Sequence, residues 1–331
     1  MTSFTQKFNA TFGADMAGPL VAFVAVMVVF GTLADNFLSA GTFGSVAFQL
    51  PELGLLTLAM LLPLLTGGIN LSITFAANLS GLAAAWVLQA NGGVNAPPSA
   101  FLLACLAALL TGAAAGALTG AAIAYTRAHP ILVTLSMMIF LRGLGEFLTR
   151  GGDISGFPDY VSTIGHGSVL GLPIPLIIFI ACVGLWHVLL TRAKLGFGLL
   201  MIGSNIESAR YSGLNTRRIL ILVYTLSGVM CAIAGLIMLA RFNSVRVGHG
   251  ESYLLITVLA AFLGGINPFG GFGRVLPVFV ALIVLQLLSS GLNLMGANQH
   301  LATALWGVLM IVVMAARTLA SRFATSRRRK A

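Results

Sequence analysis

The segment Arg192–Arg218, RAKLGFGLLMIGSNIESARYSGLNTRR, is polar and basic in a chain of 331 residues that is otherwise almost continuously apolar. Apolar runs long enough to cross a bilayer recur on both sides of it, and each is a candidate transmembrane helix. A membrane protein that keeps one long charged loop on one side of the bilayer can use that loop to contact a soluble partner. The segment therefore predicts an integral membrane protein with a polar contact surface outside the bilayer.

The composition supports the same class. Hydrophobic residues make up 58% of the chain and charged residues 8%, and the mean hydropathy is +1.00. Soluble domains usually carry about 25% charged residues, so the chain has too few polar side chains to cover a water-facing surface. We expect an all-α polytopic membrane protein that forms one transmembrane domain over residues 1–331. Cys105, Cys182 and Cys231 all lie inside apolar runs, which predicts core residues rather than disulfides or a metal site.

The apolar runs predict about ten transmembrane helices. The first is expected to be retained rather than cleaved as a signal peptide, because its apolar stretch is long and no clear cleavage site follows. The eighth is short for a full crossing. The approximate ranges are 17–34, 48–66, 70–90, 99–124, 131–149, 171–190, 218–240, 251–266, 275–292 and 299–317.

The lysines and arginines predict that the N and C termini are both cytoplasmic. Ten spans place the two termini on one side, and 14 of the 18 basic residues then fall on that side, against three outside and one within a span. This bias follows the positive-inside rule. The predicted cytoplasmic parts are the N-terminal segment 1–16, the loop 191–218 and the basic tail 318–331, which can bind anionic lipid. The bases are dispersed without an aromatic-lined groove, so no nucleic-acid partner is expected.

Three uncharged polar residues of the third span, Asn70, Thr74 and Asn78, are spaced at i, i+4 and i+8. They would offer hydrogen bonds to a hydroxyl-rich solute without a charge that traps it. Alternatively, they join neighbouring helices by hydrogen bonds worth roughly 0.6–2 kcal/mol each. The sequence leaves a solute path and helix packing open as interpretations.

The fifth span contains two charged residues, Arg142 and Glu146, which share a helix face because they are four residues apart. An arginine at a helix centre costs roughly 2.5–3.5 kcal/mol on insertion scales. Both residues lie toward the predicted outer end of the span. We expect a helix-end ion pair, with a role in the solute path as the alternative.

Small residues and prolines predict details of the helices. Gly112, Gly116 and Gly120 recur every four residues, a spacing that lets two helices approach closely. Pro51 and Pro130 are expected at helix starts, where the missing N–H of proline costs nothing.

No motif for nucleotide binding or catalysis occurs in the sequence. The phosphate-binding pattern G-x-x-x-x-G-K-[ST] is absent, as are H-E-x-x-H and G-x-S-x-G, and the five histidines are scattered. Without a nucleophile–base pair, the chain is not expected to be an enzyme or to hold a cofactor.

Within the polar segment, Ser204 is expected to cap a short helix that begins near Asn205, with Glu207 in its first turn. Gly213 would end this helix before the next span. A short surface helix held at both ends by spans can transmit motion from a cytoplasmic partner. An ordinary amphipathic connector is the alternative.

Four segments of the chain resemble the permeases of ATP-binding-cassette (ABC) importers, in particular the ribose-type sugar permease family, which includes autoinducer-2 permeases. Glu207-Ser208-Ala209 followed by Gly213-Leu214 is similar to the E-x-A…G-[IL] loop of these permeases. The four segments are TGGINLSIT (66–74), HPILVTLSMMIFLRG (129–143), GSNIESARYSGLN (203–215) and FLGGINPFGGFGRV (262–275).

The resemblance implies a multi-pass permease subunit of the bacterial plasma (inner) membrane. It implies pairing with a second copy or a sister permease, two cytoplasmic ABC ATPase subunits that bind the ATP, and an extracytoplasmic solute-binding protein. The implied substrate is a small neutral solute such as a monosaccharide, moved by alternating access. Glu207, Ala209, Arg210 and Gly213 would then belong to the coupling loop that contacts the ATPase.

One position departs from the family pattern. The family usually has an acid in the first segment, G-G-I-D-L-S-V-G, where this chain has Asn70, and Thr74 stands where glycine is common. The change points to an altered substrate or to a diverged partner in a heterodimer. The alternative function is an ion-gradient-driven secondary transporter, which predicts acids buried in mid-span. Of the acidic residues, only Glu146 and Glu52 come close to a mid-span position, and both lie near predicted span ends.

Overall fold

The computed structural model describes residues 16–298, 301, 304–313 and 315, and nearly all of its regular structure is helical. Seven described helices are long and apolar enough to cross a membrane, and shorter apolar helices cover Ala17–Leu33, Lys194–Ser204, Tyr253–Leu263 and Ala304–Val313. The long helices are α3 (Ala40–Leu65), α4 (Ile73–Ala90), α5 (Pro98–Thr126), α6 (Pro130–Thr149), α8 (Ile174–Arg192), α11 (Thr216–Phe242) and α13 (Val275–Leu294). The chain is thus an all-α, multi-pass membrane protein.

The remaining elements are short. They are α2 (Ala17–Leu33), η2 (Gly93–Asn95), α7 (Asp159–His166), α9 (Lys194–Ser204), α10 (Ile206–Tyr211), α12 (Tyr253–Leu263) and four two-residue strands. Strand β1 (Ile154–Ser155) pairs antiparallel with β4 (Ser244–Val245), and β2 (Ser168–Val169) pairs antiparallel with β3 (Leu172–Pro173).

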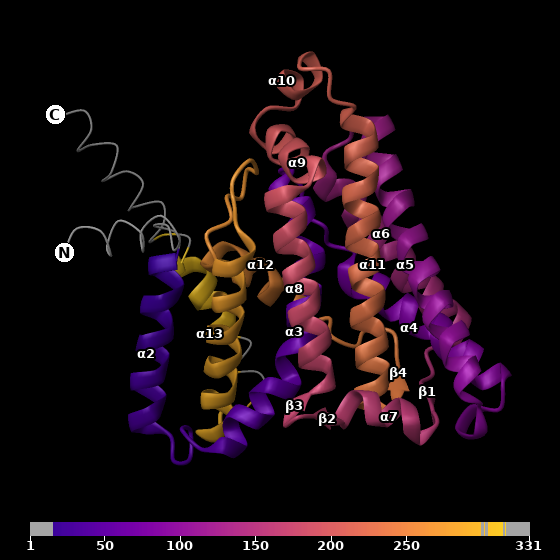
Figure 1. Ribbon diagram of the computed structural model, residues 1–331, viewed down its shortest axis with the longest axis vertical. Helices are drawn as coiled ribbons and strands as arrows, with labels where there is room; N and C mark the ends of the chain where they lie inside the picture. The colour runs from indigo at the N-terminus through magenta and orange to yellow at the C-terminus, as the bar shows by residue number, and fades with distance from the viewer. Residues whose placement is uncertain (1–15, 299–300, 302–303, 314, 316–331) are drawn as a thin grey trace.

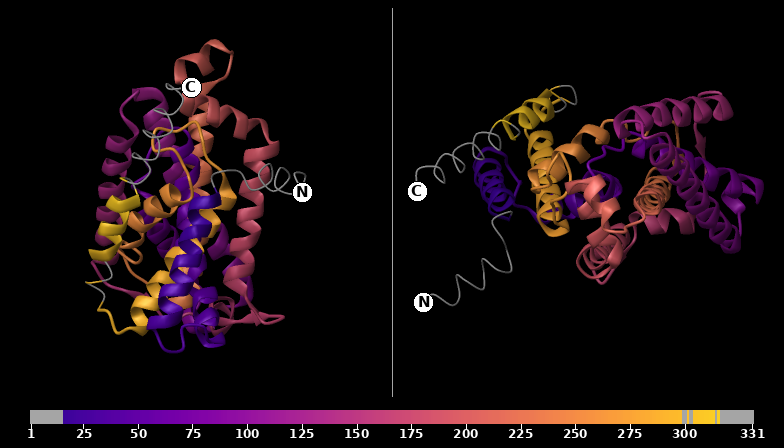
Figure 2. Two further views of the ribbon diagram at one scale, coloured as in Figure 1. Left: turned by 90° about the vertical axis from the view of Figure 1, so that its left-hand side faces the viewer. Right: turned by 90° about the horizontal axis from the view of Figure 1, so that it is seen from above.

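The long helices run side by side along the long axis of the molecule (Figure 1). Helices α9 and α10 project at one end, and α7 with the short strands lies at the opposite end. Seen from above, α2 and α13 occupy one edge of the bundle, and α5 and α6 the other (Figure 2). Helix α3 is the most buried of the spans, because it packs against α11, α12, α8 and α13.

The glycine spacing in α5 marks a packing seam with α11, as predicted. A Cβ at Gly112 would meet the carbonyl oxygen of Gly228, and a Cβ at Gly116 would meet that of Tyr224. These contacts are with the backbone of α11, so no side-chain movement relieves them. The small residues therefore let α5 and α11 pack backbone to backbone.

The expected start of the second span was wrong. Helix α3 begins at Ala40 rather than near residue 48, and Pro51 lies inside it. Ser39 caps the helix by accepting a hydrogen bond from the backbone N–H of Thr42. Proline inside a membrane helix is tolerated because neighbouring helices and local adjustments satisfy the freed carbonyl. As a result, Glu52 lies in the helix interior rather than near an end. Pro130 is in the first turn of α6, as expected.

Two further boundaries differ from the prediction. Asn70 does not share a helix face with Thr74 and Asn78, because α4 starts only at Ile73. The polar segment 191–218 contains two helices, α9 and α10, and the cap of α10 is Asn205 rather than Ser204. The hydroxyl of Ser204 donates instead to the carbonyl of Leu200, within α9. Residues 1–15 and the basic tail 318–331 lie outside the described residues, as does part of the tenth expected span.

Candidate functional site

Both ends of the short helix α10 are capped by hydrogen bonds. The Asn205 side chain accepts a hydrogen bond from the Ser208 N–H at 2.9 Å. At the other end Gly213 takes a positive φ of 82°, which favours glycine, and the Leu214 N–H donates to the carbonyl of Ala209. Ala209 is fully buried, whereas Glu207 is exposed. Helix α10 therefore buries Ala209 and exposes the charged side chains of Glu207 and Arg210.

A cavity of about 880 Å³ lies beside α10. It opens at the surface and is lined by the ends of α5 and α9, the turn after α3, the α5–α6 loop, α10 and the start of α11. Glu207 and Arg210 line it, together with Arg127, Arg217 and Phe269. Arg217 also lies over the ring of Tyr125 in α5, with 5.4 Å from the guanidinium carbon to the ring centroid. The cavity gives this end of the molecule a basic, hollowed surface.

The base of α9–α10 is packed against two other turns. A Cβ at Gly203 would collide with the Leu65 carbonyl oxygen at the end of α3 and with the backbone of Gly271. The Gly271 N–H itself donates to the same Leu65 carbonyl at 2.9 Å. Three segments distant in sequence thus meet without intervening side chains. The end of α9, next to α10, is therefore in backbone contact with the end of α3 and with the α12–α13 turn.

Asn70 is buried at 3% exposure and occupies the turn between α3 and α4. Its oxygen accepts hydrogen bonds from the N–H and the hydroxyl of Ser72. Its side-chain nitrogen donates to the Ser227 hydroxyl oxygen at 3.0 Å, and that hydroxyl donates to the Ala59 carbonyl at 2.7 Å. Asn70 therefore links α3, α4 and α11.

Thr74 and Asn78 are also buried, at 1% and 4% exposure. The Thr74 hydroxyl and the Asn78 side-chain nitrogen have no hydrogen-bond partner among the residues that the structure describes. Asn78 borders a small recess shared with Gly235 and His249. The structure thus places the two residues in the core between α4 and α11 and not in a large cavity, and their role in a solute path stays a prediction.

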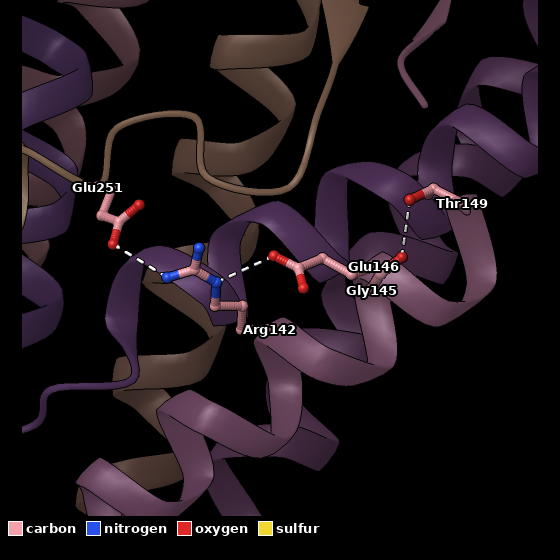
Figure 3. Close-up of polar contacts among 5 residues, drawn as sticks. All are labelled: Arg142, Gly145, Glu146, Thr149 and Glu251. Atoms are coloured by element: carbon pink, nitrogen blue, oxygen red, sulfur yellow. Dashed lines mark hydrogen bonds and ion pairs between the residues drawn. The ribbon is translucent and has the colours of Figure 1, made fainter. Parts of the chain in front are cut away.

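Arg142 and Glu146 form the predicted ion pair. The Arg142 Nε donates to a Glu146 oxygen at 2.9 Å, and a second guanidinium nitrogen contacts Glu251 at 3.3 Å (Figure 3). All three side chains are about half exposed. An exposed network of this kind contributes little stability, but it ties α6 to the loop before α12. Sequence reasoning missed Glu251 because it is 109 residues from Arg142.

A second ion pair was also missed. Glu52 is 1% exposed, and one of its oxygens lies 2.6 Å from a guanidinium nitrogen of Arg241 at the end of α11. The Tyr253 hydroxyl donates to the other oxygen at 3.3 Å. The signal in the sequence that could have revealed this pair was Glu52, an acidic residue inside an apolar run. This pair connects α3, α11 and α12 near the end opposite α10.

Comparison with known proteins places the chain in a transport family. Residues 42–314 match the family model described as "Branched-chain amino acid transport system / permease component". The chain is 32% identical to the ribose import permease protein RbsC of Escherichia coli over 303 residues, covering 89% of this chain and 91% of that protein.

It is also 32% identical to the autoinducer 2 import system permease protein LsrD of Yersinia enterocolitica over 273 residues, covering 81% of this chain and 80% of that protein. No solved structure matches the chain. The chain forms a bundle of apolar helices and is similar to permeases over most of its length. It therefore belongs to this family of transport-system permease components.

Proposed function

We propose that the chain is the membrane-spanning permease subunit of an ABC importer and that separate ATPase subunits drive it through α10. The observation that carries the proposal is the junction at Gly203. There the base of α9–α10 contacts the backbone of both α3 and the α12–α13 turn. Gly203 lies at the end of α9, directly before α10, so a force applied to α10 by the ATPase would reach both membrane segments through α9. Alternating access of the solute follows from such motion.

The proposed topology has ten spans, with both termini in the cytoplasm of a bacterium and the bundle in its inner membrane. The bases of the described chain support this orientation. The end that carries α10 holds Arg127, Arg192, Lys194, Arg210, Arg217, Arg218 and Arg274, whereas the opposite end holds Arg150, Arg241 and Arg246.

The proposed partners are two cytoplasmic ABC ATPases that bind the ATP, a second permease copy or sister permease, and an extracytoplasmic solute-binding protein. The proposed substrate is a small neutral solute, a monosaccharide. The names of the relatives support this class, because one is a ribose permease and the other an autoinducer-2 permease.

The buried Glu52 is the observation that favours the alternative, an ion-gradient-driven transporter, because intramembrane acids carry protons or ions in such proteins. Its pairing with Arg241 at 2.6 Å argues for a structural role instead. Uptake that persists without an ATPase and stops when the ion gradient is dissipated would establish the alternative.

The test of the proposed function reverses one charge on α10. In the reconstituted importer, Glu207→Lys is expected to abolish ATP-dependent uptake and to release the ATPase during purification, because it places a cation where the partner meets an anion. The protein should remain folded, since Glu207 makes no contact in the core. Asp35→Lys, an exposed charge reversal in the α2–α3 loop at the opposite end, is the matched control and should retain uptake. Full coupling in Glu207→Lys would overturn the proposal.

A further inference from the structure

A recess opposite α10 lies between two helices that are far apart in sequence. Two adjoining cavities of about 370 and 410 Å³ share Gln49, Ser289 and Asn293 among their lining residues. Gln49 belongs to the first half of α3, and Ser289 and Asn293 to the last half of α13. These halves lie next to each other at the lower end of Figure 1. Volumes of this order hold small-molecule ligands.

Two hydroxyl groups at this recess, those of Ser45 and Ser289, are not bonded to the helices that carry them, whereas the hydroxyl oxygens of Ser39 and Thr42 make hydrogen bonds at the start of α3. Serine and threonine in helices often bond back to the carbonyl four residues earlier, as Thr57, Ser80 and Thr111 do here. Within the described part of the chain, Ser45 and Ser289 have no such partner, although both line the recess. Their hydroxyls remain available as donors and acceptors.

A buried amide joins the two helices at the bottom of the recess. The Gln286 side chain is 7% exposed, and its nitrogen donates to the Gln49 side-chain oxygen at 3.0 Å. This bond uses one donor and one acceptor. The Gln286 oxygen and the Gln49 nitrogen have no other partner among the described residues, so both remain free for a solute.

The charges at the recess exclude an ionic ligand. Among the described lining residues the one charged side chain is Glu251, and it is already paired with Arg142 at 3.3 Å. A zwitterion or a phosphorylated solute would need a compensating charge in this partly desolvated space. Trp306 and Tyr253 also line the recess and offer apolar ring surface beside the hydrogen-bonding groups.

We propose that this recess is an outward-facing binding site for an uncharged, polyhydroxylated solute. Gln49, Gln286, Ser289 and Asn293 exchange hydrogen bonds with the solute hydroxyls, and the aromatic rings contact its carbon skeleton. The inference rests on the proposed function as a permease and specifies where the solute first binds. The residues proposed to contact the solute first are thus on α3 and α13, and not Thr74 and Asn78 in the core.

The test uses thiol labelling of the full chain, without any ATPase, in vesicles whose external face is outward. In a Cys105→Ala background, Ser289→Cys and Asn293→Cys are treated with a membrane-impermeant methanethiosulfonate reagent. Ribose, galactose, xylitol and leucine are each added in large excess. Both engineered thiols are expected to react, and at least one of the three polyols should slow the reaction several-fold, while leucine should not. Ser168→Cys, in the exposed β2 strand outside the recess, should react at the same rate with or without polyol.

A second substitution checks the hydrogen-bonding role. Added to Asn293→Cys, Gln286→Leu should remove the protection by polyol, measured against the labelling rate of the same variant without solute. Absence of labelling at both sites, protection by none of the polyols, or equal protection by leucine would overturn the inference. Because no ATPase is present, these outcomes are independent of the Glu207→Lys experiment, and either proposal can fail alone.

Discussion

Asn70 and Ser227 are joined by hydrogen bonds that require an amide at position 70. The Ser227 hydroxyl has one proton, which it donates to the Ala59 carbonyl, so its oxygen needs a donor and receives one from the Asn70 nitrogen. A carboxylate at position 70 has no proton to give. The family pattern has an acid at this position. The Ser227 hydroxyl in α11 needs a donor, and this need explains why an amide suits this chain.

Asn70→Asp is therefore expected to destabilise the protein. Either the Ser227 hydroxyl turns to the carboxylate and leaves the Ala59 carbonyl unpaired, or two acceptors face each other. An unsatisfied buried group costs about 1–3 kcal/mol. The midpoint of thermal unfolding of the purified protein measures the loss. Asn267→Asp is the control, because Asn267 ends the sequence Gly-Gly-Ile-Asn, as Asn70 does. Among the described residues, however, its side chain makes one hydrogen bond, in which its oxygen accepts from the Phe269 N–H. Equal midpoints for wild type and Asn70→Asp would contradict this account.

The buried pair of Glu52 and Arg241 makes a second prediction at the same scale. Removing one partner, as in Glu52→Ala, leaves Arg241 with an uncompensated charge and is expected to cost about 3–5 kcal/mol. Replacing both with leucine should cost clearly less, because no lone charge remains. Thermal unfolding of the two variants in detergent measures the difference. A Glu52→Ala protein that is as stable as wild type but has lost uptake would instead indicate an ion-carrying role.

Local spacing allowed prediction of some polar contacts and not others. The pair of Arg142 and Glu146 was predictable because residues four apart share a helix face. The contacts of Glu52 with Arg241 and of Asn70 with Ser227 depend on how distant spans pack, and no local pattern encodes that. The sequence marked these residues only as polar groups inside apolar runs.

Among the described elements, α5 and α11 have the most extensive contact, and glycine makes it possible. Gly116→Ala places a methyl group against the Tyr224 carbonyl and the backbone of Thr225, so the two helices must separate. Overpacking of this kind costs about 1–3 kcal/mol. Gly184→Ala in α8 is the matched control because nothing lies within 4 Å of its new methyl group. That control should be neutral or stabilising by up to about 1 kcal/mol, since alanine favours helix more than glycine.

The unfolding midpoints of the two glycine variants show whether α5 and α11 can accommodate a methyl group at position 116. A lowered midpoint in Gly116→Ala together with an unchanged or raised one in Gly184→Ala is expected. Similar midpoints would show that the bundle accommodates a wider spacing between α5 and α11.

Helix existence was more predictable than helix ends. The apolar runs located the long helices, because length and hydropathy are properties of each segment alone. The start of α3 differs from the prediction because proline is typical of the first turn of a helix, whereas Pro51 lies inside α3 and Ser39 caps it. In the polar segment, adjacent residues Ser204 and Asn205 are both capping types, and only the fold shows that Ser204 bonds within α9.

At the scale of the whole molecule, the two ends of the bundle have different chemistry. The α10 end is basic and hollowed, and the opposite end has the uncharged recess between α3 and α13. The family and the multi-pass class were predictable from motifs spread along the chain. The recess was not, because Gln49 and Gln286 are 237 residues apart and meet only in the folded bundle.

An ATPase can drive the spans through α10 only if α10 faces the cytoplasm. The most direct measurement places a cysteine at this helix by Ser208→Cys in the Cys105→Ala background and exposes it to an impermeant thiol reagent from each side of the membrane. Ser208 is exposed, so a thiol at this position can react with the reagent. Labelling in inside-out vesicles and none in intact cells is the predicted result. Labelling in intact cells would contradict the central claim.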